Sequence, residues 1–185
     1  MKTAPREMHI IAGHDAEHLS TVRELFREYA QSLEIDLCFQ GFEEELAELP
    51  GRYAPPGGRL LLAVASTTAT GCVALREIGN GICEMKRLYV RPEFRRKGTG
   101  RILAVRIIDE ARGIGYRRMR LDTLSSMKEG IALYQSLGFR AIEPYYHNPS
   151  DCAVFMELDL GGNHKSQSPT PKQIPNPKLQ NQTRR

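Results

Sequence analysis

The sequence of 185 residues predicts a mixed α/β fold (α+β), in which a central mixed sheet of about seven strands carries about four helices on its faces. Three short aliphatic segments in the middle of the chain, separated by turn-forming residues, indicate a meander of strands. In the second half, helical periodicity alternates with further strand-like segments. A content of 41% hydrophobic and 26% charged residues is typical of a globular domain and argues against fibrous and membrane-spanning classes.

The first elements are expected to be a strand and two helices. The apolar run at 9–12 fits a short strand, and Asp15 can cap a helix after it. The apolar positions of that helix recur at helical spacing: Leu19, Val22, Leu25, Phe26, Tyr29 and Leu33. A second short helix is predicted over 42–49, ended by Pro50 and Gly51.

The central meander is expected to comprise strands over 59–65, 71–77 and 83–90. The Gly-Asn-Gly sequence at 79–81 marks a hairpin turn between the last two strands. Because proline cannot donate a hydrogen bond to a sheet ladder, Pro92 ends the third strand.

The second half begins with a helix from about Gly98, for which Gly113 is placed as the C-terminal stop. Its predicted buried face follows a helical repeat: Gly100, Leu103, Ala104, Ile107, Ile108 and Ala111. The remaining elements are expected in the order strand, helix, strand, strand, over 120–123, 128–137, 139–142 and 153–160.

A single domain is predicted over residues 7–160, between a flexible N-terminus at 1–6 and a disordered tail at 161–185. The tail has four prolines and four glutamines, too little apolar surface to offset its ordering entropy. It also holds five basic and no acidic residues, so that residues 1–160 carry 21 basic against 22 acidic side chains. We therefore expect no nucleic-acid partner.

The sequence also favours a cytoplasmic protein, a monomer or a homodimer, that does not bind a membrane. The longest apolar run, 60–65, has six residues against the roughly 20 that span a bilayer, and residues 1–6 lack a signal-sequence core. The four cysteines are widely spaced without a C-x-x-C motif, so neither a disulfide framework nor a metal is expected: Cys38, Cys72, Cys83 and Cys152.

A basic, glycine-containing loop at 90–100 carries the most informative chemistry. Free backbone N–H groups and the positive dipole end at a helix start form an anion site, and the glycines let the anion approach the backbone. Four side chains add positive charge: Arg95, Arg96, Lys97 and Arg101. A phosphate or pyrophosphate would be the natural ligand, with a solvated basic turn as the alternative. No Walker motif occurs, and Leu103 breaks a dinucleotide fingerprint.

The spacing Arg95-x-x-Gly98-x-Gly100 resembles the acetyl-CoA loop, [QR]-x-x-G-x-[GA], of the GNAT superfamily of N-acetyltransferases. Residues 88–92 resemble the strand that precedes that loop, and the sequence at 132–139 resembles the family's A-L-Y-x-x-x-G-F segment. The resemblance implies a largely antiparallel twisted sheet and an acyltransferase that moves an acetyl group from acetyl-CoA to a small-molecule or peptide primary amine by direct attack in a ternary complex. It implies no metal. The implied acetyl-CoA contacts are Leu88, Tyr89, Val90, Arg95, Arg96, Lys97, Gly98, Thr99, Gly100, Arg101, Ser125 and Ser126.

The resemblance also implies two catalytic residues. An alkyl amine is mostly protonated at pH 7, so a base must take its proton, and the thiolate leaving group benefits from an acid. Glu84 stands where one branch of the family has its base, and Tyr134 matches the tyrosine beside the CoA sulfur. The alternatives are a surface Glu84 paired with Arg76 or Lys86, and a Tyr134 packed in the core.

Further candidate residues concern the acceptor and one contact to CoA. Substrate contacts are expected from Tyr29 and from the loop before the last strand, through Tyr145, Tyr146 and His147, where His147 is an alternative base and structural packing the alternative role. Met127 replaces an asparagine that contacts CoA in many family members, and Ser125 or Ser126 is expected to substitute for it.

Two competing functions have some support in the sequence. The motif H-x-x-E-H, which starts at His14, matches a zinc-peptidase pattern without an obvious third ligand, so a polar first helical turn is favoured. A non-catalytic acetyl-CoA-binding module is the other alternative.

Overall fold

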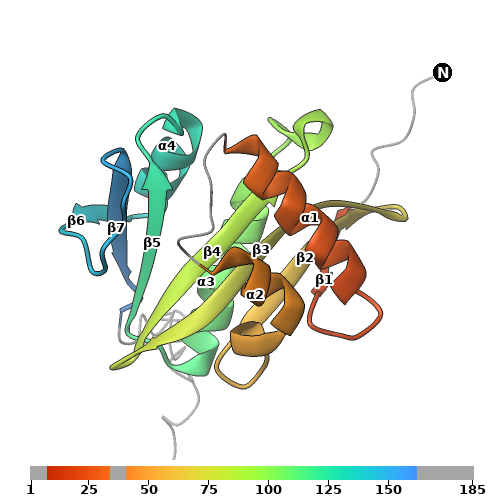
Figure 1. Cartoon of the computed structure of the whole chain (residues 1–185), viewed down its shortest axis with the longest axis horizontal. Helices are drawn as coiled ribbons and strands as arrows, with labels where there is room; N and C mark the ends of the chain where they lie inside the picture. The colour runs from red at the N-terminus through yellow and green to blue at the C-terminus, as the bar shows by residue number, and fades with distance from the viewer. Residues whose placement is uncertain (1–7, 34–40, 162–185) are drawn as a thin grey trace, which may run out of the picture.

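One sheet of seven strands, in the order β1-β2-β3-β4-β5-β7-β6, organises residues 8–33 and 41–161, which are the residues described by the computed structural model (Figure 1). The strands are β1 Met8–Ala12, β2 Arg59–Ala65, β3 Thr68–Gly79, β4 Ile82–Val90, β5 Arg118–Leu124, β6 Arg140–Ile142 and β7 Ala153–Asp159. All neighbouring strands are antiparallel except β4 and β5, which are parallel. This confirms the predicted mixed, largely antiparallel sheet.

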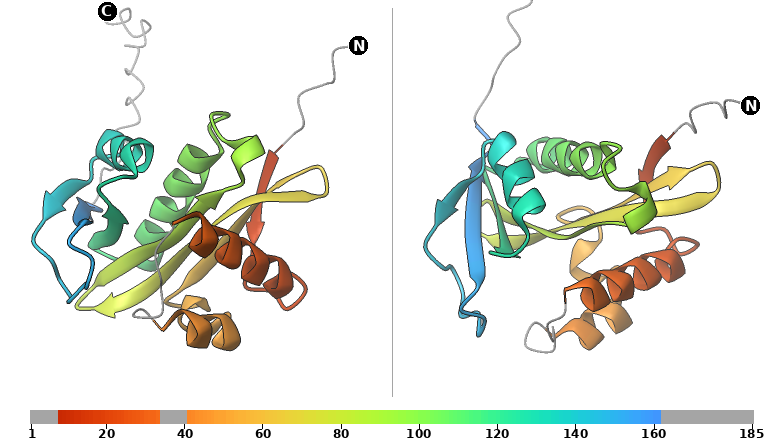
Figure 2. Two further views of the ribbon diagram at one scale, coloured as in Figure 1. Left: turned by 45° about the horizontal axis from the view of Figure 1, so that its top comes forward. Right: turned by 90° about the horizontal axis from the view of Figure 1, so that it is seen from above.

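The helices cover both faces of the sheet. They are α1 Leu19–Ser32, α2 Phe42–Glu48, α3 Thr99–Ile114 and α4 Lys128–Ser136, with short 3₁₀ turns η2 Gly51–Tyr53 and η3 Pro92–Phe94. Figure 2 shows α1 and α2 on one side and α3 and α4 on the other. Side chains along β2 alternate accordingly: Leu60 and Leu62 pack with α1, whereas Leu61 and Ala63 pack with α3. Each fully buried leucine contributes about 1.5–3 kcal/mol to folding.

Several predicted boundaries need correction. The N-cap of α1 is His18, because Asp15 lies one turn earlier and its carbonyl accepts the His18 N–H. Helix α3 continues through Gly113 and ends at Gly115, whose φ of 102° is the left-handed conformation of a helix stop. The hairpin turn at Asn80 is confirmed, but β3 is longer at both ends than predicted.

A β-bulge opens the sheet between β4 and β5. Their backbone pairing runs only from Ile82 opposite Arg118 to Glu84 opposite Arg120. The register of β4 with β3 then shifts, and Arg87 has a φ of +56°. Beyond this point the strands diverge, which Figure 1 shows as a V-shaped gap that opens toward α4. The bulge therefore creates the space in which a ligand can lie between two strands.

Two predicted segments, residues 1–6 and the tail from 162 onward, lie outside the described residues, as does Cys38. Among the helices that are described, none has the length and the apolar character needed to cross a membrane.

Candidate active site

The basic loop ends at the N-terminus of α3, as the sequence indicates. Gly98 is the N-cap, with a φ of +84°, and Arg96 before it has a φ of +60°. The first helical N–H groups have no acceptor within the helix and remain available to an anion. A Cβ built at Gly98 meets nothing within 4 Å, and one at Gly100 lies 3.7 Å from Val90 Cγ2. The loop is therefore open above its backbone.

The loop cations are held close to this helix start. Arg95 donates to the Val90 carbonyl over 2.8 Å, and Lys97 donates to a carbonyl of the preceding turn over 2.9 Å. The Arg96 side chain is 86% exposed and faces Glu129 at 3.4 Å. Arg101 donates to the Ser136 hydroxyl on α4. The structure thus brings the helix N-terminus and these charges together at the loop where the sequence predicts an anion site.

A cavity of about 430 Å³ leads from this loop into the gap between β4 and β5. Its walls include five predicted acetyl-CoA contacts: Leu88, Tyr89, Val90, Arg95 and Ser126. Met127 and Gly130 from the start of α4, and Tyr29 from α1, complete it. Ser125 does not line it, and its N–H instead donates to the Cys152 carbonyl. Ser126 is thus the serine beside Met127 that faces the cavity.

A second, inner cavity of about 40 Å³ adjoins the first, and the two share lining from Tyr29, Leu33, Leu88, Leu124 and Met127. Tyr134 on α4 is part of the wall of the inner cavity. The two adjoining cavities lie along the hollow from the basic loop toward the middle of the sheet.

Tyr134 lies in the wall of the inner cavity. Its ring packs edge-on against Phe139 at 5.7 Å, so the predicted core packing is present. Its hydroxyl makes no hydrogen bond to residues 8–33 or 41–161. Burial raises the pKa of Tyr134 well above its usual value, so the side chain is protonated at neutral pH.

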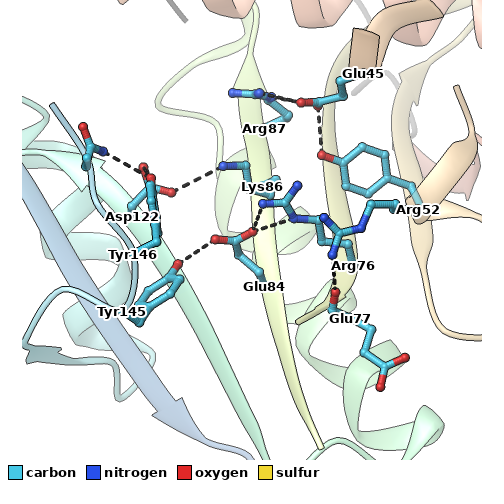
Figure 3. A network of polar contacts seen from close by, with 12 residues as sticks. Glu45, Arg52, Arg76, Glu77, Glu84, Lys86, Arg87, Asp122, Tyr145 and Tyr146 are labelled. Carbon is cyan, nitrogen blue, oxygen red and sulfur yellow. Dashed lines mark hydrogen bonds and ion pairs between the residues drawn. The ribbon is translucent and has the colours of Figure 1, made fainter. Parts of the chain in front are cut away.

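Glu84 lies deeper in the sheet than the cavity lining. The residue is 1% exposed, and its carboxylate accepts hydrogen bonds from Arg76 Nε at 2.6 Å and from the Tyr145 hydroxyl at 2.7 Å (Figure 3). The Arg76 pairing that the sequence left open is therefore present, although the residue does not face solvent. Burial, followed by the Glu84 charge, raises the pKa of Tyr145, which keeps its hydroxyl a donor.

Five polar residues of the inner cavity were not predicted from the sequence as site residues. They are Lys86, Arg87, Asp122, Thr123 and Asn148. Lys86 Nζ lies 3.5 Å from Asp122 Oδ1, and the Tyr146 hydroxyl donates to Asp122 Oδ2 over 2.9 Å (Figure 3). Burial lowers the pKa of Lys86, while the nearby carboxylates oppose that effect. The parallel register of β4 with β5 brings Lys86 and Asp122 together, whereas Asn148 comes from the loop before β7.

The predicted acceptor residues divide into three groups. Tyr29 lines both cavities, and burial raises its pKa to about 12. Tyr145 and Tyr146 pack against Phe155 at 5.2 and 5.3 Å between ring centroids, and their hydroxyls bind the carboxylates of β4 and β5. His147 is exposed and lines neither cavity, whereas Asn148 does line the inner one.

The histidines of the H-x-x-E-H motif face their own neighbours. His14 Nε2 is 3.8 Å from Asp15, and His18 Nε2 is 3.5 Å from Glu17. Within the described ranges, no group of three or more possible metal ligands occurs.

Comparison with known proteins agrees with this fold. The family described as Acetyltransferase (GNAT) matches residues 19–139. An uncharacterized N-acetyltransferase of Schizosaccharomyces pombe is 42% identical over 84% of this chain and 97% of its own length. A GNAT acetyltransferase structure from Staphylococcus aureus has a TM-score of 0.71 at 20% identity, covering 84% of this chain and all of that one. The structure of a putative Salmonella typhimurium acetyltransferase with acetyl-CoA has a TM-score of 0.65 at 23% identity, covering 88% and 99%. The chain therefore belongs to the GNAT family of acetyltransferases.

Proposed function

We propose that the protein is an acetyl-CoA-dependent N-acetyltransferase that acetylates a primary amine by direct attack in a ternary complex. The observation that carries this proposal is the hollow that runs from the basic loop, between the split strands, to the Tyr134 hydroxyl. The structurally similar Salmonella protein contains acetyl-CoA, which supports the same donor here. We also propose that the protein acts in the cytosol, as the sequence predicts.

The residues present fit acetyl-CoA. The N–H groups at the start of α3 and the nearby side chains of Arg95, Arg96 and Lys97 would hold the pyrophosphate, since Gly98 leaves the backbone uncovered. The edge of β4 beyond Glu84 no longer pairs with β5, so its backbone groups are available to the amides of the pantetheine arm. The cavity walls at 88–90 follow that edge.

The acceptor must give up a proton, and two carboxylates lie close enough to the inner cavity to be considered as the base. Glu84 is proposed to act through water, because its carboxylate lies outside the lining. Asp122 is a second candidate, favoured by its place in the cavity wall. A free lysine-type amine has a pKa of about 10.4, so either carboxylate would have to act on a mostly protonated acceptor at pH 7.

The proposed reaction requires one acid and one base. The ammonium of the acceptor first loses one proton to solvent. The neutral nitrogen then bonds to the thioester carbon, the carbon–sulfur bond breaks, and the second proton of the amine passes to the carboxylate. Tyr134, which lines the inner cavity, would give its proton to the departing thiolate and regain one from the carboxylate through water.

A free-thiol assay over a panel of amines tests the function. Binding of acetyl-CoA without turnover of any amine would instead support the non-catalytic binding module. Tyr134→Phe should lower kcat at every pH, whereas Asp122→Asn or Glu84→Gln should lower it by about 10²–10⁴-fold with a deficit that shrinks at high pH. Tyr116→Phe is the matched control, since that hydroxyl donates to the Gly57 carbonyl and lines neither cavity. A Tyr134→Phe enzyme as active as this control would refute the assignment of the acid.

A further inference from the structure

An ion pair crosses the gap in the sheet at the position where the two backbones separate. Glu84 and Arg120 form the last backbone pair of β4 with β5, and two residues further along each strand stand Lys86 and Asp122. Their side chains are 5% and 13% exposed and lie 3.5 Å apart, from Nζ to Oδ1. Both residues line the inner cavity. A positive and a negative group thus lie side by side where the acceptor is proposed to bind.

The other charged groups around this pair are already matched. Arg87 also lines the cavity, but two hydrogen bonds of 2.6 and 3.0 Å tie its guanidinium to Glu45. Glu84 is neutralised by Arg76 at 2.6 Å. Within residues 8–33 and 41–161, Asp122 is the one carboxylate of the inner cavity wall. The wall therefore presents one anion to an acceptor and at least one cation beside it.

We infer that the acceptor is an α-amino acid, whose amine binds at Asp122 and whose carboxylate binds at Lys86. This inference rests on the proposed function and narrows its substrate class. In an α-amino acid only two carbon atoms separate the nitrogen from the carboxylate oxygens, so the two charges can lie against two neighbouring side chains. The four groups then alternate in sign, and the acceptor adds two attractive contacts while the existing ion pair is kept.

Other classes of amine fit this wall less well. An amine without a carboxylate places its positive charge beside the Lys86 ammonium and brings no negative group to offset the repulsion. A diamine adds a second cation, for which the inner cavity holds no second carboxylate among the described residues. A peptide N-terminus has a neutral amide where the amino acid has its carboxylate. The wall thus favours a free amino acid over a polyamine or a protein terminus.

The test compares acceptors that differ only in the carboxylate. Using the full chain and acetyl-CoA, kcat/KM is measured for standard L-amino acids and their decarboxylated or amidated partners, such as phenylalanine, phenethylamine and phenylalaninamide. We expect the acid to be preferred by roughly 10- to 100-fold, the size of one hydrogen bond between charged groups. Equal or better use of the neutral partners, or turnover of only polyamines or peptides, would overturn the inference while leaving the proposed function intact.

The variant Lys86→Met tests the residue itself. It keeps the length of the side chain and removes the charge, so the preference ratio of acid over amine should fall by roughly the same 10- to 100-fold. An unchanged ratio would show that Lys86 has no part in recognition.

If no amine is turned over, the proposed function fails, and the inference about the acceptor is then tested by binding measurements alone. Calorimetric titration of phenylalanine and phenethylamine into the protein with CoA should then show tighter binding of the acid. Equal affinities would overturn the inference.

Discussion

Replacing the buried carboxylate of Glu84 tests how much its ion pair with Arg76 contributes to the free energy of unfolding. Glu84→Gln removes a charge that accepts hydrogen bonds from Arg76 and Tyr145. Burial alone would lower the pKa of Arg76, but Glu84 and neighbouring groups outweigh burial and hold that pKa above its usual value. The substitution therefore leaves a partly buried guanidinium without its closest counter-charge.

The expected loss follows from the exposure of the two partners. Removing one member of a fully buried pair costs about 3–5 kcal/mol. The Arg76 side chain is 23% exposed, against 1% for Glu84, so water can solvate part of the guanidinium. The glutamine also keeps one acceptor for the Tyr145 hydroxyl. We expect the free energy of unfolding to fall by about 2–3 kcal/mol, which lowers Tm by about 5–10 °C for a chain of this size.

Urea denaturation of the full chain measures this loss, with Glu157→Gln as the matched control. Glu157 on β7 accepts from Arg120 at 2.7 Å but is 19% exposed, so the same substitution should cost about 1 kcal/mol or less. A Glu84→Gln variant no less stable than Glu157→Gln would refute the reasoning. If such a stable variant also showed a kcat deficit that disappears at high pH, Glu84 would be acting as the base.

Three further predictions concern the loop, the tail and acid stability. Gly100→Glu should abolish acetyl-CoA binding in calorimetry while the domain stays folded, because its Cβ makes only an ordinary contact with Val90 and its carboxylate repels the pyrophosphate; unchanged affinity would contradict this. Truncation after Leu160 should leave Tm and acetyl-CoA affinity unchanged, since the tail sequence has few apolar residues, and a large drop in Tm would show that the tail packs on the domain. Burial would raise the pKa of Glu45, but the hydrogen bonds and charge of Arg87 outweigh it and hold that pKa below its usual value. Stability from this pair is therefore complete above the unfolded glutamate pKa of about 4.3 and lost as the pH falls through the lower folded value, so Glu45→Gln should flatten the acid side of the stability curve measured by urea denaturation, and parallel curves would refute this.

Features that depend only on neighbouring residues could be predicted from the sequence. The strand over 59–65 has the predicted boundaries, and α2 begins at Phe42 and ends before Pro50, as expected. The sequence predicted Gly98 at the start of α3, because a positive φ at a helix start is a local backbone requirement that glycine meets. The loop proposed to bind acetyl-CoA was recognisable for the same reason, because its glycines and cations lie within a few consecutive residues.

Where two neighbouring residues both suited a helix end, the sequence did not determine which one is used. Gly113 and Gly115 both suit a helix end, and the structure uses Gly115. The Gly115 N–H donates to the Ala111 and Arg112 carbonyls, and the Tyr116 N–H donates to the Ala111 carbonyl. Asp15 suits an N-cap, but α1 starts one turn later, and its apolar face packs with β2.

The composition of the inner cavity depends on tertiary structure alone. Lys86 and Asp122 are 36 positions apart and meet because β4 and β5 run parallel in one register, while the bulge at Arg87 ends their backbone pairing. Glu84 is buried because Tyr145, which is 61 positions away, lies over it. Parallel register and bulge position are set by contacts between distant segments, and a local pattern of residue types carries no information about which of these segments become neighbours.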